Sequence, residues 1–255
     1  MVKDSAEFYD LFAAQYHLIV EDWESEIRRT GEALAPFLPP CEASGSILDC
    51  ACGIGTQALA LASLGYRVDG SDLSPRAVDR ILTEAAHRGL SIRVWVDDMR
   101  SLAKAPSADY QAVLCMGNSL AHLEDEADLC ATFRAIHDRT RPGGKILLGF
   151  RDYRPYRGPG CHTMPAPVVY STGAKRRIFL QVWDWLDEYN YLNHVFISQE
   201  QGGAWEDLHI VSPFRVHLPE EVAALAEATG YREIQVLFSG PPGWEMITIV
   251  GTKPI

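Results

Sequence analysis

The sequence has no long apolar run. No apolar stretch reaches the roughly 18 residues that a helix needs to cross a lipid bilayer. The first residues also lack the basic start and the apolar segment of a secretory signal peptide. These two absences predict a cytoplasmic protein with no membrane partner.

Paired cysteines and a basic surface stripe are missing as well. None of the six cysteines forms a Cys-x-x-Cys pair, so we expect reduced thiols and no metal site. The formal net charge of −11 would repel a phosphate backbone, and no run of Lys and Arg alternates with aromatic residues. We therefore expect a small-molecule partner and no nucleic acid, while the oligomeric state stays open.

What is present is an alternation of strand and helix patterns that begins near residue 46. Ser74 as N-cap, Pro75 at the first helical position and Gly89 just past the end mark one helix clearly. Alternation of this kind predicts parallel strands joined by crossover helices. The expected fold is α/β, with a doubly wound, seven-stranded, mostly parallel sheet. The predicted strands are 46–50, 66–70, 91–96, 111–116, 145–150, 233–238 and 246–252, and the helices between them are 56–64, 75–88, 125–140 and 219–229.

Other segments flank this alternation. Helical spacing at 5–15 and 22–34 precedes it, a turn is expected at 142–144, and beyond Arg151 the chain reads as strands with aromatic residues on alternate positions. We expect a helical lid at 1–40, a core at 41–151 and 218–255, and an antiparallel β-rich insertion on the substrate side at 152–217.

A glycine loop follows the first predicted strand, in the segment Asp-Cys-Ala-Cys-Gly-Ile-Gly-Thr at 49–56. Glycine lets a ligand approach the bare backbone at the carboxyl end of a strand. The loop also fits the G-x-G-x-x-G/A pattern of dinucleotide binders, at Gly53, Gly55 and Ala58. The loop alone therefore does not identify its ligand. Asp49 suits the ammonium group of a methionine moiety better than a pyrophosphate, unless it is only a capping or strand-end carboxylate.

Two further acidic positions follow the next two strands. Asp72 can accept hydrogen bonds from both hydroxyls of a ribose. In the segment Asp-Asp-Met-Arg at 97–100, Asp98 could accept from the adenine amino group, and Met99 could pack on the ring. A solvated strand end is the alternative interpretation of both acids, Asp97 and Asp98.

The order of these parts resembles the class I S-adenosylmethionine-dependent methyltransferases over residues 46–150. The segment Cys-Met-Gly-Asn-Ser-Leu-Ala-His-Leu at 115–123 is similar to the Gly-Asn-Ser-Phe-Ala-His-Leu segment of glycine N-methyltransferases. Phe-Arg-Asp-Tyr at 150–153 is similar to their His-Arg-Asn-Tyr segment, and residues 9–23 look like the leader of bacterial glycine/sarcosine methyltransferases.

This resemblance implies S-adenosylmethionine as the cofactor and assigns roles to individual residues. Arg151 and Asn118 would hold the carboxylate of a substrate, although Arg151 could instead pair with a nearby acid. Tyr170 would line the methyl site or merely pack in a sheet. Apart from the resemblance, His122 could act as a base or, as a single His just after a loop, make a structural hydrogen bond. The expected cofactor-binding residues are Tyr16, Trp23, Asp49, Ala51, Gly53, Gly55, Asp72, Leu73, Asp98, Met99 and Met116.

The function expected from these assignments is methyl transfer to the amine of a small substrate, most readily glycine, sarcosine or a similar amino acid. A sugar amine or a hydroxyl is an alternative acceptor for the same cofactor site. An NAD-dependent oxidoreductase is permitted by the glycine loop but disfavoured by Asp49 and by the Asp98–Met99 pair. A cofactor-binding protein without activity is a third alternative.

Overall fold

The structure is a computed structural model that describes residues 2–41, 45–158, 160–163, 168–172, 175–240 and 245–255. For 161–163, 168–172, 175 and 201 it describes the backbone only. Within these ranges no helix is long and apolar enough to span a membrane.

A seven-stranded sheet forms the centre of the molecule, in the order β11-β12-β5-β4-β1-β2-β3. Neighbouring strands run parallel, except that β12 is antiparallel to both β5 and β11. The predicted doubly wound, mostly parallel sheet is therefore confirmed. Its strands are β1 (Ser46–Asp49), β2 (Arg67–Asp72), β3 (Arg93–Val96), β4 (Tyr110–Cys115), β5 (Thr140–Arg151), β11 (Arg232–Ser239) and β12 (Met246–Thr252).

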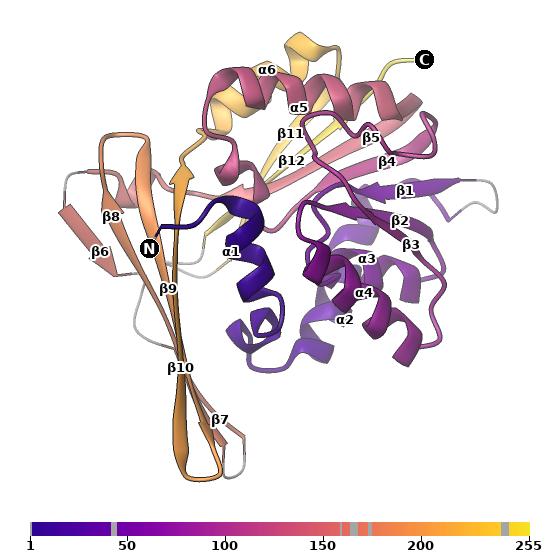
Figure 1. Ribbon diagram of the computed structural model, residues 1–255. Helices are drawn as coiled ribbons and strands as arrows, with labels where there is room; N and C mark the ends of the chain where they lie inside the picture. Colours follow the sequence, from indigo (N-terminus) through magenta and orange to yellow (C-terminus); the bar gives the residue numbers. More distant parts are fainter. Residues whose placement is uncertain (1, 42–44, 159, 164–167, 173–174, 241–244) are drawn as a thin grey trace.

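Helices cover both faces of this sheet and make three layers (Figure 1). On one face lie α2 (Trp23–Leu34), α3 (Thr56–Ser63) and α4 (Pro75–His87), and on the other lie α5 (Glu126–Arg139) and α6 (Pro219–Thr229). Each helix turns one apolar stripe to the sheet, so the core splits into two clusters. Ile27, Leu59 and Ile81 belong to the first cluster, whereas Phe133, Ile136 and Val222 belong to the second.

The chain reverses its direction of progress across the sheet between β1 and β4. From β1 it moves outward through β2 to β3, and it then returns to continue from β4 to β5 on the other side. Ligands of open α/β sheets collect at the carboxyl ends of the strands at such a switch point. The predicted glycine loop follows β1, and so it lies at this place.

A second, five-stranded antiparallel sheet stands beside the first, in the order β10-β9-β8-β6, with β7 also paired to β8. Figure 1 shows helix α1 (Ser5–Phe12) lying between the two sheets. Phe8, Phe12 and Leu18 pack with residues of the second sheet in one apolar cluster. The strands are β6 (Gly160–Thr163), β7 (Val168–Thr172), β8 (Lys175–Trp185), β9 (Asn190–Gln201) and β10 (Ala204–Arg215), and the 3-10 turns are η1 (Tyr16–Ile19), η2 (Ala35–Phe37), η3 (Ser119–His122) and η4 (Arg154–Tyr156).

Two local predictions were wrong. The turn expected at 142–144 lies inside β5, because Gly143 donates to the carbonyl of Lys253, which in turn donates to the carbonyl of Gly144. This pairing carries the strand back to Thr140. The helix expected at 5–15 ends at Phe12, and the chain then turns into η1, which buries Leu18 against the second sheet.

Candidate functional site

The loop between β1 and α3 bends on two glycines with left-handed backbone angles. Gly53 has φ 52° and Gly55 has φ 102°, where other residues are strained. Gly55 is also closely packed, since a Cβ there would lie 2.6 Å from Cγ1 of Ile81. Gly53 donates its N–H to Oδ2 of Asp72 at 2.8 Å. The loop is thereby tied to the end of the neighbouring strand.

Asp72 ends β2 and lines a cavity of about 330 Å³ together with Leu73, Ala51 and Gly53. Its second oxygen, Oδ1, accepts from the N–H of Ser74 at 2.9 Å. Burial raises the pKa of Asp72, and the two backbone donors act against that rise. A carboxylate held in this way keeps lone pairs for the hydroxyl groups of a bound ligand.

Asp49 ends β1 and lies beneath the loop, completely buried. Neither of its carboxylate oxygens makes a hydrogen bond to any residue that the structure describes. Burial raises the pKa of Asp49 to about 7, and the charge of Asp72 adds to the rise; the N–H groups of Ala51 and Ala58 oppose it, although they fall short of hydrogen-bond geometry. Asp49 is not among the residues that line the cavity, so it would act on a ligand through charge and not by contact.

The segment after β3 supplies one wall of the cavity. Asp97 is structural, since its carboxylate accepts from the N–H groups of Asp98 and Lys104. The Asp98 carboxylate lies 2.7 Å from the guanidinium of Arg100. Burial raises the pKa of Asp98, but its hydrogen bonds with Arg100 outweigh this and leave the pKa below its usual value. Met99 lines the same wall, so the predicted Asp98–Met99 pair does face the cavity.

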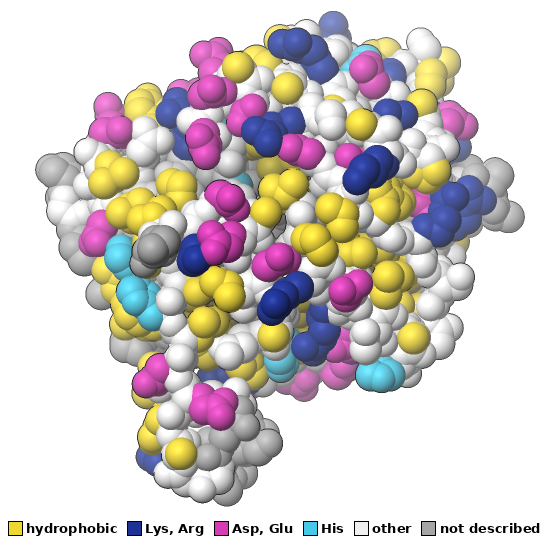
Figure 2. All heavy atoms as spheres, viewed as in Figure 1, with side chains coloured by type: hydrophobic (Ala, Val, Ile, Leu, Met, Phe, Trp, Pro, Cys, Tyr) yellow, Lys and Arg dark blue, Asp and Glu magenta, His cyan; other side chains and the backbone are white. Residues whose placement is uncertain are grey.

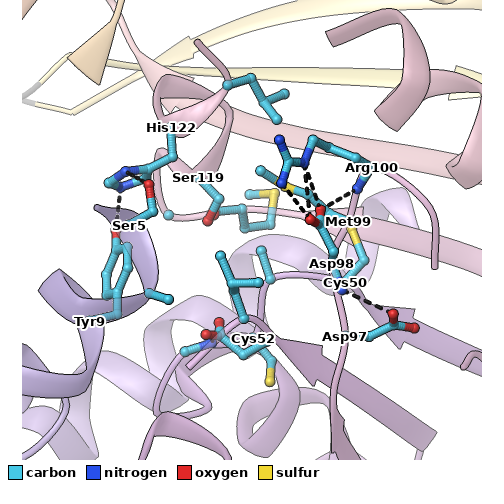
Figure 3. Close-up of a pocket in the computed structure, with 18 of the residues that line it drawn as sticks. Ser5, Tyr9, Cys50, Cys52, Asp97, Asp98, Met99, Arg100, Ser119 and His122 are labelled. Carbon is cyan, nitrogen blue, oxygen red and sulfur yellow. Dashed lines mark hydrogen bonds and ion pairs between the residues drawn. The ribbon is translucent and has the colours of Figure 1, made fainter. Parts of the chain in front are cut away.

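The opposite wall joins α1 to η3 (Figure 3). The Tyr9 hydroxyl lies 2.9 Å from Nε2 of His122, and the Ser5 hydroxyl lies 3.1 Å from Nδ1. All three side chains line the cavity. Burial lowers the pKa of His122 to about 3, so its ring is neutral. His122 was predicted from the sequence, whereas Ser5 and Tyr9 were not; their only signal in the sequence is two hydroxyl groups on an otherwise apolar helix face.

Arg151 and Asn118, which were predicted to hold a substrate carboxylate, lie next to each other at the end of β5 and just after β4, and their contact runs through the Arg151 backbone. Asn118 has φ 71°, and its Oδ1 accepts from the backbone N–H of Arg151 at 3.0 Å. Its Nδ2 donates to the Tyr153 hydroxyl at 2.7 Å. The Arg151 guanidinium carbon lies 5.3 Å from the centre of the Trp183 ring. Neither residue lines the cavity, and the amide of Asn118 shapes the backbone at Arg151.

Tyr16, Met116 and Trp23 were expected to contact the cofactor. Tyr16 and Met116 line the cavity. Trp23 does not, because its indole N–H points to Oγ1 of Thr56 at 3.4 Å and its ring lies 5.1 Å below the guanidinium of Arg88. It therefore supports the wall from behind.

Tyr170 can be placed only by its backbone. It lies in β7, where it pairs with Arg177 of β8. Its side chain is outside the described residues, so its expected place at the methyl site stays a prediction.

The lining of the cavity is acidic. Six carboxylates face it, and Arg100 is its one Lys or Arg among the described residues. An acidic cavity repels phosphate groups and attracts a cationic ligand. On the molecular face seen in Figure 2, in contrast, Lys and Arg side chains are scattered among acidic ones. The six acids are Asp4, Asp72, Asp97, Asp98, Glu124 and Asp128.

Metal ligation has no support in the described part of the chain. Five cysteines there are free thiols, and no three His, Cys, Asp or Glu side chains are grouped as a metal site would require.

Comparison with known proteins finds matches to the central part of the chain. Residues 47–144 match the family described as "Methyltransferase domain". A glycine/sarcosine N-methyltransferase from Halorhodospira halochloris is 28% identical over 149 residues, which are 58% of this chain and 54% of that protein. Rat glycine N-methyltransferase is 26% identical over 71% of this chain and 66% of its own length. The chain spans about half the length of the first relatives it matches, at 54% and 51%.

Solved structures share the whole fold. DesVI from Streptomyces venezuelae is 21% identical, with a TM-score of 0.73 and 100% coverage of both chains. The CcbJ methyltransferase from Streptomyces caelestis is 16% identical, with a TM-score of 0.77 over 99% of this chain and 100% of its own. An S-adenosylmethionine-bound amino pentose methyltransferase from Micromonospora echinaspora is 17% identical, with a TM-score of 0.74 over 95% and 96% of the two chains. The predicted resemblance is thus confirmed, and these findings support S-adenosylmethionine as the cofactor.

Proposed function

We propose that this chain transfers a methyl group from S-adenosylmethionine to the amine of a small molecule, because residues 47–144 match a methyltransferase domain and the sheet has the strand order of the class I methyltransferase fold. The observation that carries the proposal is the acidic cavity at the carboxyl ends of β1, β2 and β3. It suits a cationic, phosphate-free adenosyl ligand and opposes the pyrophosphate of a nicotinamide dinucleotide.

Several residues fit the parts of that cofactor. Asp72 would accept from the ribose hydroxyls, Leu73 and Met99 would pack near the adenine, and Asp98 would accept from its amino group. Asp49 would favour the cofactor's positive charge from beneath the glycine loop, whose Ala51 and Gly53 allow close approach. When bound, the cofactor supplies a sulfonium methyl, which is already an activated electrophile.

The chain's own residues then have to orient the acceptor amine and exclude water. Tyr9 is placed for this task, since its hydroxyl lies in the cavity wall and is fixed by His122. The neutral His122 ring can accept a hydrogen bond from the Tyr9 hydroxyl at Nε2 while its Nδ1–H donates a hydrogen bond to the Ser5 hydroxyl. In that tautomer the Tyr9 oxygen accepts from an amine N–H and directs the nitrogen lone pair at the methyl group. His122 is a positioning residue here and not the base.

An amino acid such as glycine or sarcosine is the first candidate acceptor. The names of the sequence relatives support it, and Arg151 offers a guanidinium that binds a carboxylate through two parallel hydrogen bonds. A sugar amine is the second candidate, and the amino pentose methyltransferase among the solved structures supports it.

Calorimetry and a labelled-methyl assay test the proposal together. We expect S-adenosylmethionine and its demethylated product to bind, NAD to bind much more weakly, and label to pass to one or more amines in a panel of glycine, sarcosine, dimethylglycine and amino sugars. Arg151→Ala should lose turnover of carboxylate-bearing amines and keep cofactor affinity. Tight NAD binding without uptake of S-adenosylmethionine would refute the proposed function, and unchanged glycine kinetics in Arg151→Ala would refute the carboxylate clamp.

A further inference from the structure

Three polar side chains form a row across the second sheet on the face toward α1. Trp183 of β8 pairs in register with Asn193 of β9, and Asn193 pairs with Ser212 of β10. Residues paired in register project from the same face of a sheet. Trp183 shares that face with Trp185 of β8, and both pack in the cluster that includes Tyr191. The row therefore points into the molecule and not to solvent.

This row lacks the hydrogen bonds that buried polar groups normally make. The exposed fractions of Trp183, Asn193 and Ser212 are 1%, 3% and 0%. The indole Nε1, the amide Oδ1 and the hydroxyl Oγ make no hydrogen bond with any part of the chain that the structure describes. A buried group left unpaired costs about 1–3 kcal/mol. Three such groups side by side are unusual, because native interiors contain few of them.

The neighbouring rows on the same face are mostly apolar. On one side Tyr191 pairs with Trp185 and Phe214, and on the other Val195 pairs with Gln181 and Ile210. The indole N–H of Trp185 is also buried without a hydrogen bond to any residue that the structure describes. The row of Trp183, Asn193 and Ser212 thus lies within a surface that is largely, but not wholly, apolar.

The row leads from the proposed acceptor site toward α1. At one end, the Arg151 guanidinium lies over the Trp183 ring. At the other end, the backbone N–H of Lys3 donates to the carbonyl of Val211, next to Ser212, at 2.9 Å. The segment that carries Tyr9 therefore begins directly beside Ser212.

We propose that Trp183, Asn193 and Ser212 form a subsite for the hydroxyl groups of the acceptor, which would make the acceptor a hydroxylated amine of the amino-sugar or amino-polyol class. This inference rests on the proposed methyl transfer and narrows its substrate. The Asn193 oxygen can only accept, so it needs a ligand O–H or N–H. A carboxylate or phosphate has no proton to donate at neutral pH, whereas a sugar hydroxyl can donate to Asn193 and accept from Trp183. The flanking aromatic rings suit the C–H face of a sugar ring.

A matched pair of ring amines tests the subsite in the full-length protein. D-glucosamine carries hydroxyls around the ring, and cyclohexylamine carries none. We expect the wild-type kcat/KM, calculated for each substrate on its concentration of neutral amine, to be at least about tenfold higher for D-glucosamine than for cyclohexylamine, because one satisfied hydrogen bond can contribute about that factor. Glycine is a separate arm of the same assay.

Two variants and one control locate the effect. Asn193→Leu and Ser212→Ala should each raise KM for D-glucosamine about tenfold and leave kcat/KM for cyclohexylamine and the cofactor Kd unchanged. Ser198 lies on the opposite face of β9, where its hydroxyl donates to Asp207. Ser198→Ala should change the kinetics of neither amine. The melting temperature of Asn193→Leu should stay level or rise, because the variant removes an unpaired buried group.

The outcomes separate this inference from the proposed function. Methylation of glycine alone would overturn the subsite and leave the proposed methyl transfer intact. Equal D-glucosamine kinetics in the wild type and in Asn193→Leu would do the same, and this is the result expected if the unpaired groups hold only a buried water. Cofactor binding without label transfer to any amine would instead refute the proposed function.

Discussion

The buried carboxyl group of Asp49 is predicted to make the stability of the protein depend on pH. Its folded-state pKa is about 7 because burial disfavours the charged form. Substitution Asp49→Asn removes that charge with little change in volume. We expect the variant to be more stable than the wild type at pH 8 without ligand, and to bind S-adenosylmethionine more weakly.

The magnitude follows from linkage between protonation and folding. The unfolded carboxyl titrates near 3.8 and the folded one near 7, and each pH unit between the two corresponds to about 1.4 kcal/mol. Because the folded pKa is raised, the folded state holds the extra proton. Its stabilising effect is complete below pH 4 and is lost as pH rises toward 7. The free energy of unfolding therefore falls by up to about 4 kcal/mol across this window and stays level above it.

Urea denaturation of both proteins at intervals from pH 4.5 to 8.5 measures the effect. The difference in unfolding free energy between wild type and Asp49→Asn isolates this one group from the other titrating residues. It should shift in favour of the variant as pH rises to 7 and then become constant. A difference independent of pH, or a variant less stable at pH 8 than at pH 5 relative to wild type, would refute the assignment of a raised pKa to Asp49.

Three further predictions concern the cavity and the core. Gly149→Ala would place a Cβ 2.5 Å from Cε of Met116 and push that side chain into the cavity, so calorimetry should show a severalfold weaker cofactor; an unchanged Kd would contradict this. His122→Gln should leave the pKa values of the kcat/KM profile between pH 5 and 9 unchanged, because burial keeps His122 neutral there; loss of an inflection near pH 6.5 would show that it titrates. Tyr110→Phe removes a hydrogen bond of 2.8 Å to the buried carboxylate of Asp69 and should cost about 1–3 kcal/mol in urea denaturation, whereas wild-type stability would show that Arg93 alone satisfies the carboxylate.

Local sequence signals predicted the main sheet and the cofactor side of the site. Ser74 caps α4 by accepting from the N–H of Ala77, as expected from the Ser-Pro pair. Asp72, Asp98 and Met99 reach one cavity because each lies at or just after the carboxyl end of a parallel strand. Residues at such strand ends must meet once the strand order is known.

The acceptor side could not be predicted in the same way. Tyr9 and His122 meet across 113 positions of sequence, and no periodicity connects a leader helix with a loop after the fourth strand. Trp23 was expected at the cofactor but packs behind the wall. Asn118 was expected to hold substrate, yet both of its amide atoms bond to the protein.

The sequence by itself determined the order of strands and helices, the glycine loop and the ring of strand-end acids, since these depend on spacing within short segments. Only the tertiary structure decided that Asp49 lies beneath the loop, that Arg151 rests on Trp183, and that Asn193 and Ser212 face inward without partners. The reason is physical. Burial and hydrogen bonding are set by how α1 and the second sheet fold back over the first, and that packing joins residues far apart in the chain.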